Sequence, residues 1–167
     1  MNETLITKNR SLVKPYDQQM IKPLDFDKIV KKLRGFFTPL DFKETFPQTR
    51  TSIMAACEDP KTISKYNFSG IDWPMIQTNQ MWLEYDLLKE PDLDGIFCLT
   101  TSFRDEPNPI EGRHNKIFPM FEAEHTGDFN HLLLTLSNLC VHLGFVRYKE
   151  DIKFFKYDDL CKKYGVD

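Results

Sequence analysis

Cysteine is scarce in this sequence, and the four that occur are widely spaced. Cys57, Cys98, Cys140 and Cys161 form no close pair of the kind that a zinc site needs. Nothing at the start of the chain resembles a signal peptide. We therefore expect reduced thiols in a cytoplasmic protein.

Strong net charge and long apolar runs are also lacking. The net charge is −3 at neutral pH and the isoelectric point is near 5.8, so the chain has no general attraction to nucleic acid. An RNA contact would need a local patch or a further domain. No apolar run approaches the roughly 20 residues that cross a bilayer, which excludes a membrane span. With 167 residues, 41% hydrophobic and 28% charged, the chain is long enough for one domain with a proper core.

The pattern of the chain changes near residue 25. Residues 1–24 are polar, lack a sustained period and contain Pro15, so we expect an N-terminal arm. Apolar residues recur at helical spacing over residues 26–37, which predicts an amphipathic helix with a basic outer face. We interpret that face as solvated rather than RNA-binding, because it lacks interleaved aromatics. The helix should end at Pro39 and Asp41, and the chain should then run extended to Pro47.

The middle of the chain alternates short elements with turn signals. Residues 66–72 are rich in turn formers. Thr78 and Asn79 are both acceptable caps for the helix that follows them. Gly95 should open a strand whose residues suit a half-buried sheet position. In chain order we expect a helix over residues 50–57, a strand over 73–77, a helix over 80–89 and a strand over 96–103.

The stretch from Phe103 to Glu124 carries more charge than a core strand should. Its pattern predicts an antiparallel hairpin, with one strand reaching Arg104 and Glu106, a loop rich in Pro and Gly, and a returning strand. Side chains of the returning strand alternate between two faces. The face with functional groups holds Phe118, Met120, Glu122 and Glu124. The apolar face holds Ile117, Pro119, Phe121 and Ala123.

The C-terminal part predicts two helices. Asp128 is a plausible cap for a helix with one leucine-rich apolar stripe, which Gly144 should end. We interpret it as a core helix and assign no chemistry to His131 and His142. A second, short helix is expected over residues 158–164.

The charged face of the hairpin could bind a nucleotide. Arg104 offers a rigid fork of donors for a phosphate or carboxylate, and Glu106 lies two positions on. Phe118 supplies a flat ring on the same face. The remaining candidates are Arg113 and His114, which could close over polyphosphate, and Glu122 and Glu124, which could accept from an ammonium group or hold Mg²⁺.

An ordinary structural interpretation competes with this one. The charged residues could be cross-strand ion pairs on the wet face of a sheet, and composition alone favours that view. The ordered set of residue types favours the nucleotide site.

The same stretch resembles motif 2 of the class II aminoacyl-tRNA synthetases, which reads Phe-Arg-x-Glu, a variable loop, Arg-His, then Phe and a closing Glu. The matching positions are Phe103, Arg104, Glu106, Arg113, His114, Phe118 and Glu124. The segment over residues 26–47 is similar to motif 1, which builds the dimer interface of the family. Thr78 and Gln80 stand where the family has Ser-x-Gln. The resemblance covers about residues 25–145 and implies an α+β fold, an antiparallel sheet flanked by helices.

Within the family the chain most resembles the aspartyl and asparaginyl branch, which includes asparagine synthetase-like relatives. Aspartate enzymes usually carry a lysine where this chain has Leu83. The asparaginyl pattern Gln-Leu-x-x-Glu fits better, through Gln80, Met81 and Glu84. The returning strand, FPMFEAE, is also similar to the asparaginyl form. The resemblance therefore favours asparagine.

The resemblance implies that an amino acid is activated by ATP to an aminoacyl-adenylate. Arg104 would bridge the α-phosphate and the substrate carboxylate, Phe118 would stack on adenine and Glu106 would bind the adenine edge. Arg113 or His114 would reach the outer phosphates. The amino acid would be held by Gln80, Glu84 and Glu122, and Mg²⁺ by Glu124. A homodimer through residues 26–47 and tRNA contacts through other regions are also implied.

The chain departs from the family in two ways. Ile117 replaces the acidic residue that precedes the stacking Phe. Motif 3, with a second ATP-binding arginine, is absent, so we expect residues 25–167 to be a partial catalytic domain. Three alternatives stay open: a non-catalytic paralogue that binds a partner through motif 1, a nucleotide-binding module without turnover, and an asparagine synthetase-like ligase.

Overall fold

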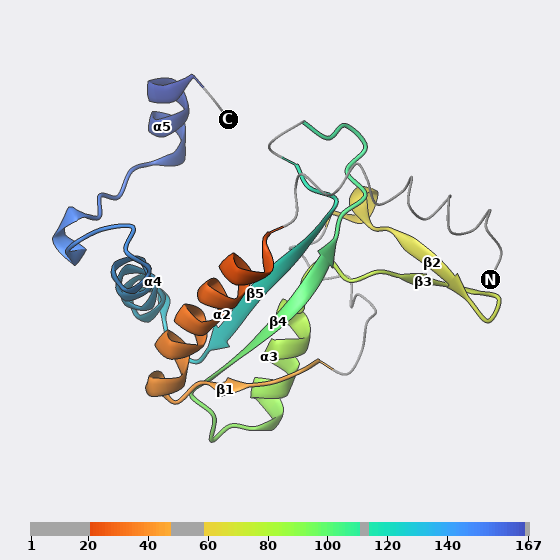
Figure 1. Ribbon diagram of the computed structural model, residues 1–167, viewed down its shortest axis with the longest axis horizontal. Helices are drawn as coiled ribbons and strands as arrows, with labels where there is room; N and C mark the ends of the chain where they lie inside the picture. Colours follow the sequence, from red (N-terminus) through yellow and green to blue (C-terminus); the bar gives the residue numbers. More distant parts are fainter. Residues whose placement is uncertain (1–20, 48–58, 111–113, 166–167) are drawn as a thin grey trace. The chain divides into compact units, whose positions relative to one another are not determined.

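A computed structural model describes residues 21–47, 59–110 and 114–165 (Figure 1). It divides into two compact units, Met1–Thr126 and Gly127–Asp167. The N-terminal arm up to residue 20 and the predicted helix over residues 50–57 lie outside the described residues. The prediction of one catalytic domain over residues 25–167 stays a prediction.

The first unit is built on a three-stranded sheet with the order β1-β4-β5. Strands β4 (Gly95–Phe103) and β5 (Ile117–His125) form the predicted hairpin, in antiparallel register from Gly95 opposite His125 to Phe103 opposite Ile117. The short β1 (Lys43–Glu44) pairs with β4 in parallel. The predicted α+β class, with an antiparallel hairpin flanked by helices, is therefore confirmed, and the parallel pairing of β1 makes the sheet mixed.

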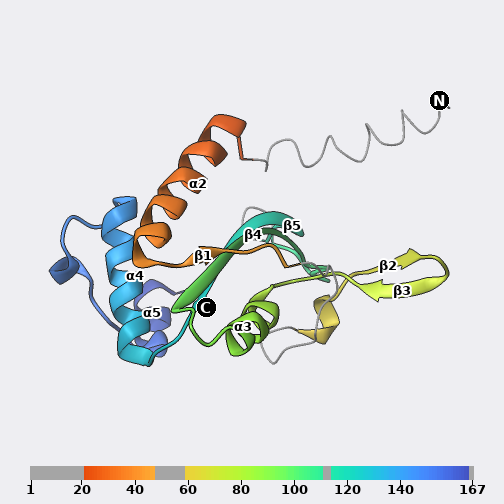
Figure 2. The same cartoon turned by 90° about the horizontal axis from the view of Figure 1, so that it is seen from below.

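Helices cover both faces of this sheet (Figure 2). Helix α2 (Pro23–Phe37) places Phe37 against Phe97 of β4 and Phe121 of β5, with ring centroids 5.8 and 5.3 Å away. Helix α3 (Gln80–Lys89) buries Leu83 completely against Ile96 and Cys98 on the opposite face. Alternation along β4 and β5 thus supplies an apolar layer to α2 and directs the functional side chains toward the α3 side.

Local signals explain the bounds of α2. Proline suits the first turn, where its missing N–H has no intrahelical partner, and Pro23 stands there. Pro39 lies in the 3₁₀ turn η1 (Thr38–Leu40) that ends the helix, and Asp41 follows in the left-handed region with φ 63°. The Arg34 guanidinium then donates to both carboxylate oxygens of Glu44, at 2.9 and 2.6 Å. This bidentate pair ties the end of α2 to β1.

Residues 65–74 form a second sheet that we did not predict. Strands β2 (Lys65–Phe68) and β3 (Ile71–Pro74) pair in antiparallel register and follow the 3₁₀ turn η2 (Pro60–Thr62). Their two-residue turn has positive φ at both Ser69 (54°) and Gly70 (77°), as a type I′ turn requires. The expected loop over residues 66–72 and strand over 73–77 were therefore wrong in detail.

The second unit is helical. Helix α4 (Phe129–Leu143) begins after Asp128, whose carboxylate accepts from His131 N at 2.9 Å, and ends at Gly144 with φ 84°. These caps confirm the predicted bounds. The 3₁₀ turn η3 (Lys149–Asp151) and helix α5 (Tyr157–Tyr164) complete the unit. None of the helices in the described ranges is long and apolar enough to cross a membrane.

Candidate functional site

Arg104 and Phe118 meet at the loop end of the β4–β5 hairpin. Arg104 N donates to Lys116 O at 2.7 Å, which extends the strand pairing one residue past β4. The guanidinium carbon of Arg104 lies 5.6 Å from the centroid of the Phe118 ring, within the range of a cation–π contact. Arg104 is exposed and Phe118 is half-buried. A flat ring and a cation thus lie side by side on one face of the sheet.

Glu106 does not continue the strand as we predicted. Strand β4 ends at Phe103, and Asp105 N donates to Thr62 O at 2.8 Å, which pairs the chain with the segment before β2. Glu106 therefore lies half-buried in the loop, and strand alternation does not place it beside Arg104. Its proposed contact with adenine stays a prediction.

The loop between the strands holds His114, whereas Arg113 lies outside the described residues. His114 N donates to Ile110 O at 2.9 Å, and its Nδ1 accepts from Ile110 N at 3.1 Å. A ring nitrogen that accepts a hydrogen bond carries no proton, so the proton of the neutral imidazole resides on Nε2. Nε2–H is then a donor that could serve an anion.

Glu122 is held by the segment that leads into α3. Asn79 N lies 2.9 Å from both carboxylate oxygens, and Asn79 Nδ2 donates to Oε2 at 3.2 Å. The Thr78 hydroxyl donates to Oε1. This carboxylate therefore stands at the N-terminal end of α3, where backbone N–H groups and the helix dipole favour a negative charge.

Gln80 and Glu84 lie one turn apart on α3. Gln80 Nε2 and Glu84 Oε1 are 3.4 Å apart, a long hydrogen bond that orients the amide. The N-cap residue of α3 is Asn79, whose side chain makes no cap bond, but Gln80 N donates to Thr78 Oγ1 at 3.1 Å, so the Thr78 hydroxyl satisfies the first N–H group of the helix. The backbone that carries Gln80 is thereby fixed by Thr78 and, through it, by Glu122.

Glu124 has a different environment from Glu122. It lies opposite Ile96 in the register and is half-buried. Burial raises its pKa to about 7, and the nearby carboxylates of Glu84 and Glu122 add to the rise, whereas His125 opposes it. Two carboxylates two positions apart thus have contrasting surroundings.

Cross-strand ion pairs do not account for these charges. Glu122 lies opposite Cys98 and Glu124 opposite Ile96, so neither acid faces a basic residue across the hairpin. Among the described residues, Lys116 and Asp105 form an ion pair at the loop end of the hairpin, at 3.1 Å, away from both glutamates. The ordinary structural interpretation is therefore wrong for the two glutamates.

Glu124 could ligate a metal ion only at a site with few protein ligands. Within the described ranges, no three His, Cys, Asp or Glu side chains converge to hold a metal ion. Mg²⁺ is commonly bound through one or two carboxylates, with water and substrate phosphates as the other ligands. Glu124 fits that role, whereas Glu122 already uses both oxygens in hydrogen bonds.

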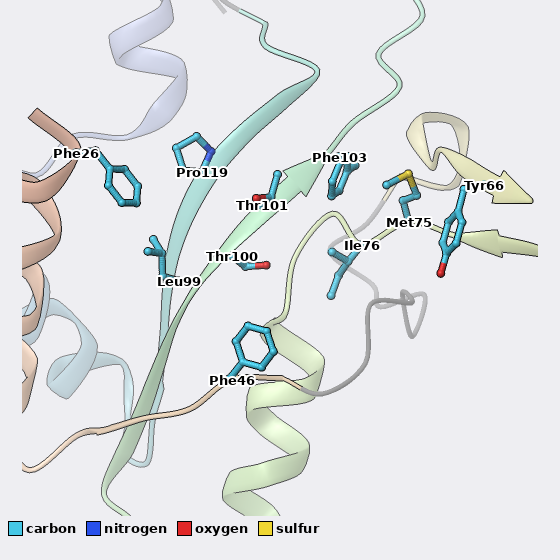
Figure 3. A pocket seen from close by; sticks show the side chains of 10 residues that line it. All are labelled: Phe26, Phe46, Tyr66, Met75, Ile76, Leu99, Thr100, Thr101, Phe103 and Pro119. Atoms are coloured by element: carbon cyan, nitrogen blue, oxygen red, sulfur yellow. The ribbon is translucent and has the colours of Figure 1, made fainter. Parts of the chain in front are cut away.

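An apolar cavity of about 660 Å³ lies apart from these residues (Figure 3). Its lining includes Phe26 of α2, Tyr66 of β2, Phe103 of β4 and Pro119 of β5. None of the predicted site residues that the structure describes lines it. The chemistry-bearing groups therefore belong to the other face of the hairpin.

Three buried side chains hold the segment before α3, and sequence analysis singled out neither Ser102 nor Gln77. Ser102 Oγ donates to Gln77 O at 2.7 Å, and Gln77 Nε2 donates to Thr62 Oγ1 at 2.7 Å. Asn79 was predicted as a cap, but its side chain donates to Glu122 instead. Only its position inside Thr-x-Gln could have drawn attention to Asn79.

No protein-family model and no curated protein matches the chain. Among solved structures the likeness is to aminoacyl-tRNA synthetases. The described fold is that of part of a synthetase core.

The matching structures include two asparaginyl-tRNA synthetases, each complexed with asparaginyl-adenylate. The Pyrococcus horikoshii enzyme matches with a TM-score of 0.65 and 20% identity, over 84% of this chain and 37% of that one. The Entamoeba histolytica enzyme matches with a TM-score of 0.61 and 21% identity, over 83% and 34%. A proposed aspartyl-tRNA synthetase from Leishmania major Friedlin matches with a TM-score of 0.56 and 16% identity, over 84% and 26%. The chain thus spans about a third of the length of the first two.

Proposed function

We propose that this chain is part of a class II synthetase-like catalytic domain that activates an amino acid, asparagine or aspartate, with ATP. The observation that carries the proposal is the contact of Arg104 with Phe118. It stands on the sheet face that also bears Glu122 and Glu124. The similarity of fold to synthetases that hold asparaginyl-adenylate supports it.

The reaction needs no protein nucleophile. A carboxylate oxygen of the amino acid attacks the α-phosphorus of ATP, the bond to the β-phosphate breaks, and pyrophosphate leaves with the electron pair. Positioning and charge stabilisation therefore carry the rate. Arg104 would hold the α-phosphate and the attacking carboxylate, because its fork can donate to two anions at once.

The nucleotide would bind along the loop end of the hairpin. Phe118 would stack on adenine and Glu106 would accept from its edge. His114, through Nε2–H, and Arg113 would reach the outer phosphates. Mg²⁺, with Glu124 as a ligand, would supply further neutralisation of the phosphate charge.

The amino acid would bind next to α3, among the polar groups of Gln80, Glu84 and Glu122. The position where aspartate enzymes usually have a lysine is Leu83, which is completely buried against Ile96 and Cys98. The uncharged, buried Leu83 side chain cannot form an ion pair with the side-chain carboxylate of a bound aspartate. We therefore propose asparagine ahead of aspartate as the substrate.

The proposal includes a homodimer through residues 26–47. Helix α2 exposes Ile29, and Phe46 after β1 has 63% of its surface exposed. A second copy would remove this apolar surface from water. Transfer to tRNA and a cytoplasmic location belong to the same proposal. Analytical sedimentation tests the dimer, and a strict monomer at all concentrations would contradict it.

ATP–pyrophosphate exchange with each amino acid tests the activity. We expect exchange to be fastest with L-asparagine and to be lost in Arg104→Ala. Arg147→Ala is the matched control, because Arg147 also stands over an aromatic ring, Tyr148, at 5.3 Å, but belongs to the second unit and to none of the proposed contacts. An Arg104→Ala variant as active as the control would overturn the proposal.

Binding without exchange would separate the alternatives. ATP binding that Arg104→Ala abolishes, with no exchange for any amino acid, would identify a nucleotide-binding module. Dimerisation without ATP binding would identify a non-catalytic paralogue. Formation of free asparagine from aspartate, ATP and ammonia would identify an asparagine synthetase-like ligase.

A further inference from the structure

Asn79 is a completely enclosed polar residue of the candidate site. Its exposed fraction is 0%, and it lies between the two positions, Thr78 and Gln80, that the sequence motif singles out. Asn79 O accepts from Trp82 N and Leu83 N, each at 2.9 Å, so its carbonyl begins the α3 ladder. Its N–H and its side-chain amide are both directed at Glu122. One residue thus joins the start of α3 to strand β5.

The orientation of the Asn79 amide follows from this hydrogen bond. Nδ2 donates to Glu122 Oε2 at 3.2 Å. The reversed amide would place Oδ1 against a carboxylate oxygen, two acceptors with no proton between them. Oδ1 is buried and accepts no hydrogen bond from the described residues. The amide is therefore committed to Glu122 alone.

The effect of this contact reaches the proposed ligand groups through a chain of hydrogen bonds. Glu122 accepts from the Thr78 hydroxyl, and that hydroxyl accepts from Gln80 N. Gln80 in turn orients toward Glu84. If Glu122 were displaced, the backbone from Thr78 to Gln80 would no longer be held in place. The side chains of Gln80 and Glu84 would then lose their fixed orientation.

We infer that Asn79 is a positioning residue, which clamps Glu122 and thereby fixes Gln80 and Glu84 for binding the amino acid. The inference rests on the proposed function for its ligand. It assigns Glu122 to the scaffold of the site, because hydrogen bonds within the chain occupy both of its oxygens. The groups left to meet the amino acid are Gln80 and Glu84.

An exchange of amide and carboxylate between the two positions tests the clamp. Asn79→Asp sets a second carboxylate against Glu122, and Glu122→Gln sets an amide against Asn79. The double variant restores one donor facing one acceptor, with the roles exchanged. Asn79→Ala, which keeps the backbone N–H donor, is a milder variant in case Asn79→Asp does not fold.

Two ligands separate positioning from general loss of structure. We expect Asn79→Asp to weaken calorimetric binding of L-asparagine by about tenfold or more, as loss of one charge-assisted contact would. Binding of ATP, whose proposed contacts lie at Arg104 and Phe118, should change by less than about twofold. The double variant should recover most of the L-asparagine affinity. Equal losses for both ligands, no loss for either, or no recovery would overturn the inference.

Hydrogen–deuterium exchange of the backbone amides, followed by NMR, tests the clamp without any ligand. The Asn79 and Gln80 amides should exchange slowly in the natural chain, faster in Asn79→Asp, and slowly again in the double variant. Asn67→Asp is the matched control, because Asn67 Nδ2 donates to Asp72 Oδ1 at 2.8 Å on the exposed β2–β3 hairpin. If the natural chain binds neither ligand, the proposed function fails, and the exchange pattern still decides the clamp. Unchanged exchange in Asn79→Asp would overturn it.

Discussion

The ring of Phe42 lies directly over the backbone of Gly95. A Cβ at residue 95 would come within 2.5 Å of Phe42 Cε1. Phe42 is buried and packs against Phe37, with ring centroids 5.1 Å apart. Glycine at the start of β4 therefore leaves the space that the Phe42 ring occupies.

Gly95→Ala should destabilise the fold because it must displace a buried ring. We expect a loss of about 1–3 kcal/mol in the free energy of unfolding, measured by urea denaturation. Gly35→Ala is the control, since nothing lies within 4 Å of a Cβ at that position in α2. It should stabilise the fold by roughly 1 kcal/mol, because alanine is the better helix former. Equal effects of the two substitutions would contradict this account of Gly95.

Leu83→Ala should show how strongly α3 is held to the sheet. Leu83 is 0% exposed and packs on Ile96 and Cys98. The lost burial and the resulting cavity should cost about 2–5 kcal/mol. On the same helix Leu88 is 83% exposed, so Leu88→Ala should change stability by less than about 0.5 kcal/mol. Urea denaturation of the two variants gives the comparison, and similar losses would refute the packing.

Stability should fall with rising pH through the titration of Glu124. Its pKa rises from 4.5 to about 7 on folding, so the folded state binds more protons than the unfolded chain. The resulting stabilisation is complete below about pH 4.5 and is lost as the pH rises through 7. Because the side chain is only half-buried, we expect on the order of 1 kcal/mol.

Glu124→Gln isolates this contribution, since glutamine keeps the size and removes the titration. As the pH rises from 5 to 8, the free energy of unfolding of the variant should increase relative to that of the natural chain. Urea denaturation at each pH measures this difference. A constant difference across that range would show that the pKa is not raised.

Phe118→Leu should weaken ATP binding while leaving the fold intact. Leucine keeps apolar bulk but removes the ring that contacts Arg104 and is proposed to stack on adenine. Loss of the cation–π contact and of stacking should cost about 1–3 kcal/mol of binding free energy. Calorimetric titration with ATP measures it. An unchanged affinity would remove Phe118 from the proposed nucleotide site.

Local signals predicted most of the elements of this fold. The bounds of α3, β4 and α4 followed from caps and from β-branched runs, which act over a few residues. The β2–β3 hairpin was missed, although Tyr66, Phe68, Ile71 and Trp73 alternate around Ser-Gly, because turn formers outweighed so short a pattern.

Contacts between distant residues could not be predicted in this way. Glu122 and Asn79 are 43 positions apart, and no local pattern relates them. The parallel pairing of β1 with β4 could not be predicted for the same reason, since Lys43 pairs with Ile96, which is distant in the sequence. Glu106 left the strand because Asp105 N pairs with Thr62 O, a contact equally remote in sequence.

The pairing pattern of the sheet also sets an order for folding. The β4–β5 hairpin joins nearby segments through nine residue pairs, whereas β1 adds two pairs only after a long loop has closed. Early contacts form between near neighbours, since closing a longer loop costs more entropy. The hairpin that carries Arg104 and Phe118 should therefore be a nucleus on which α2 and β1 later assemble, and Phe97 and Phe121, with ring centroids 5.2 Å apart, would hold that nucleus together.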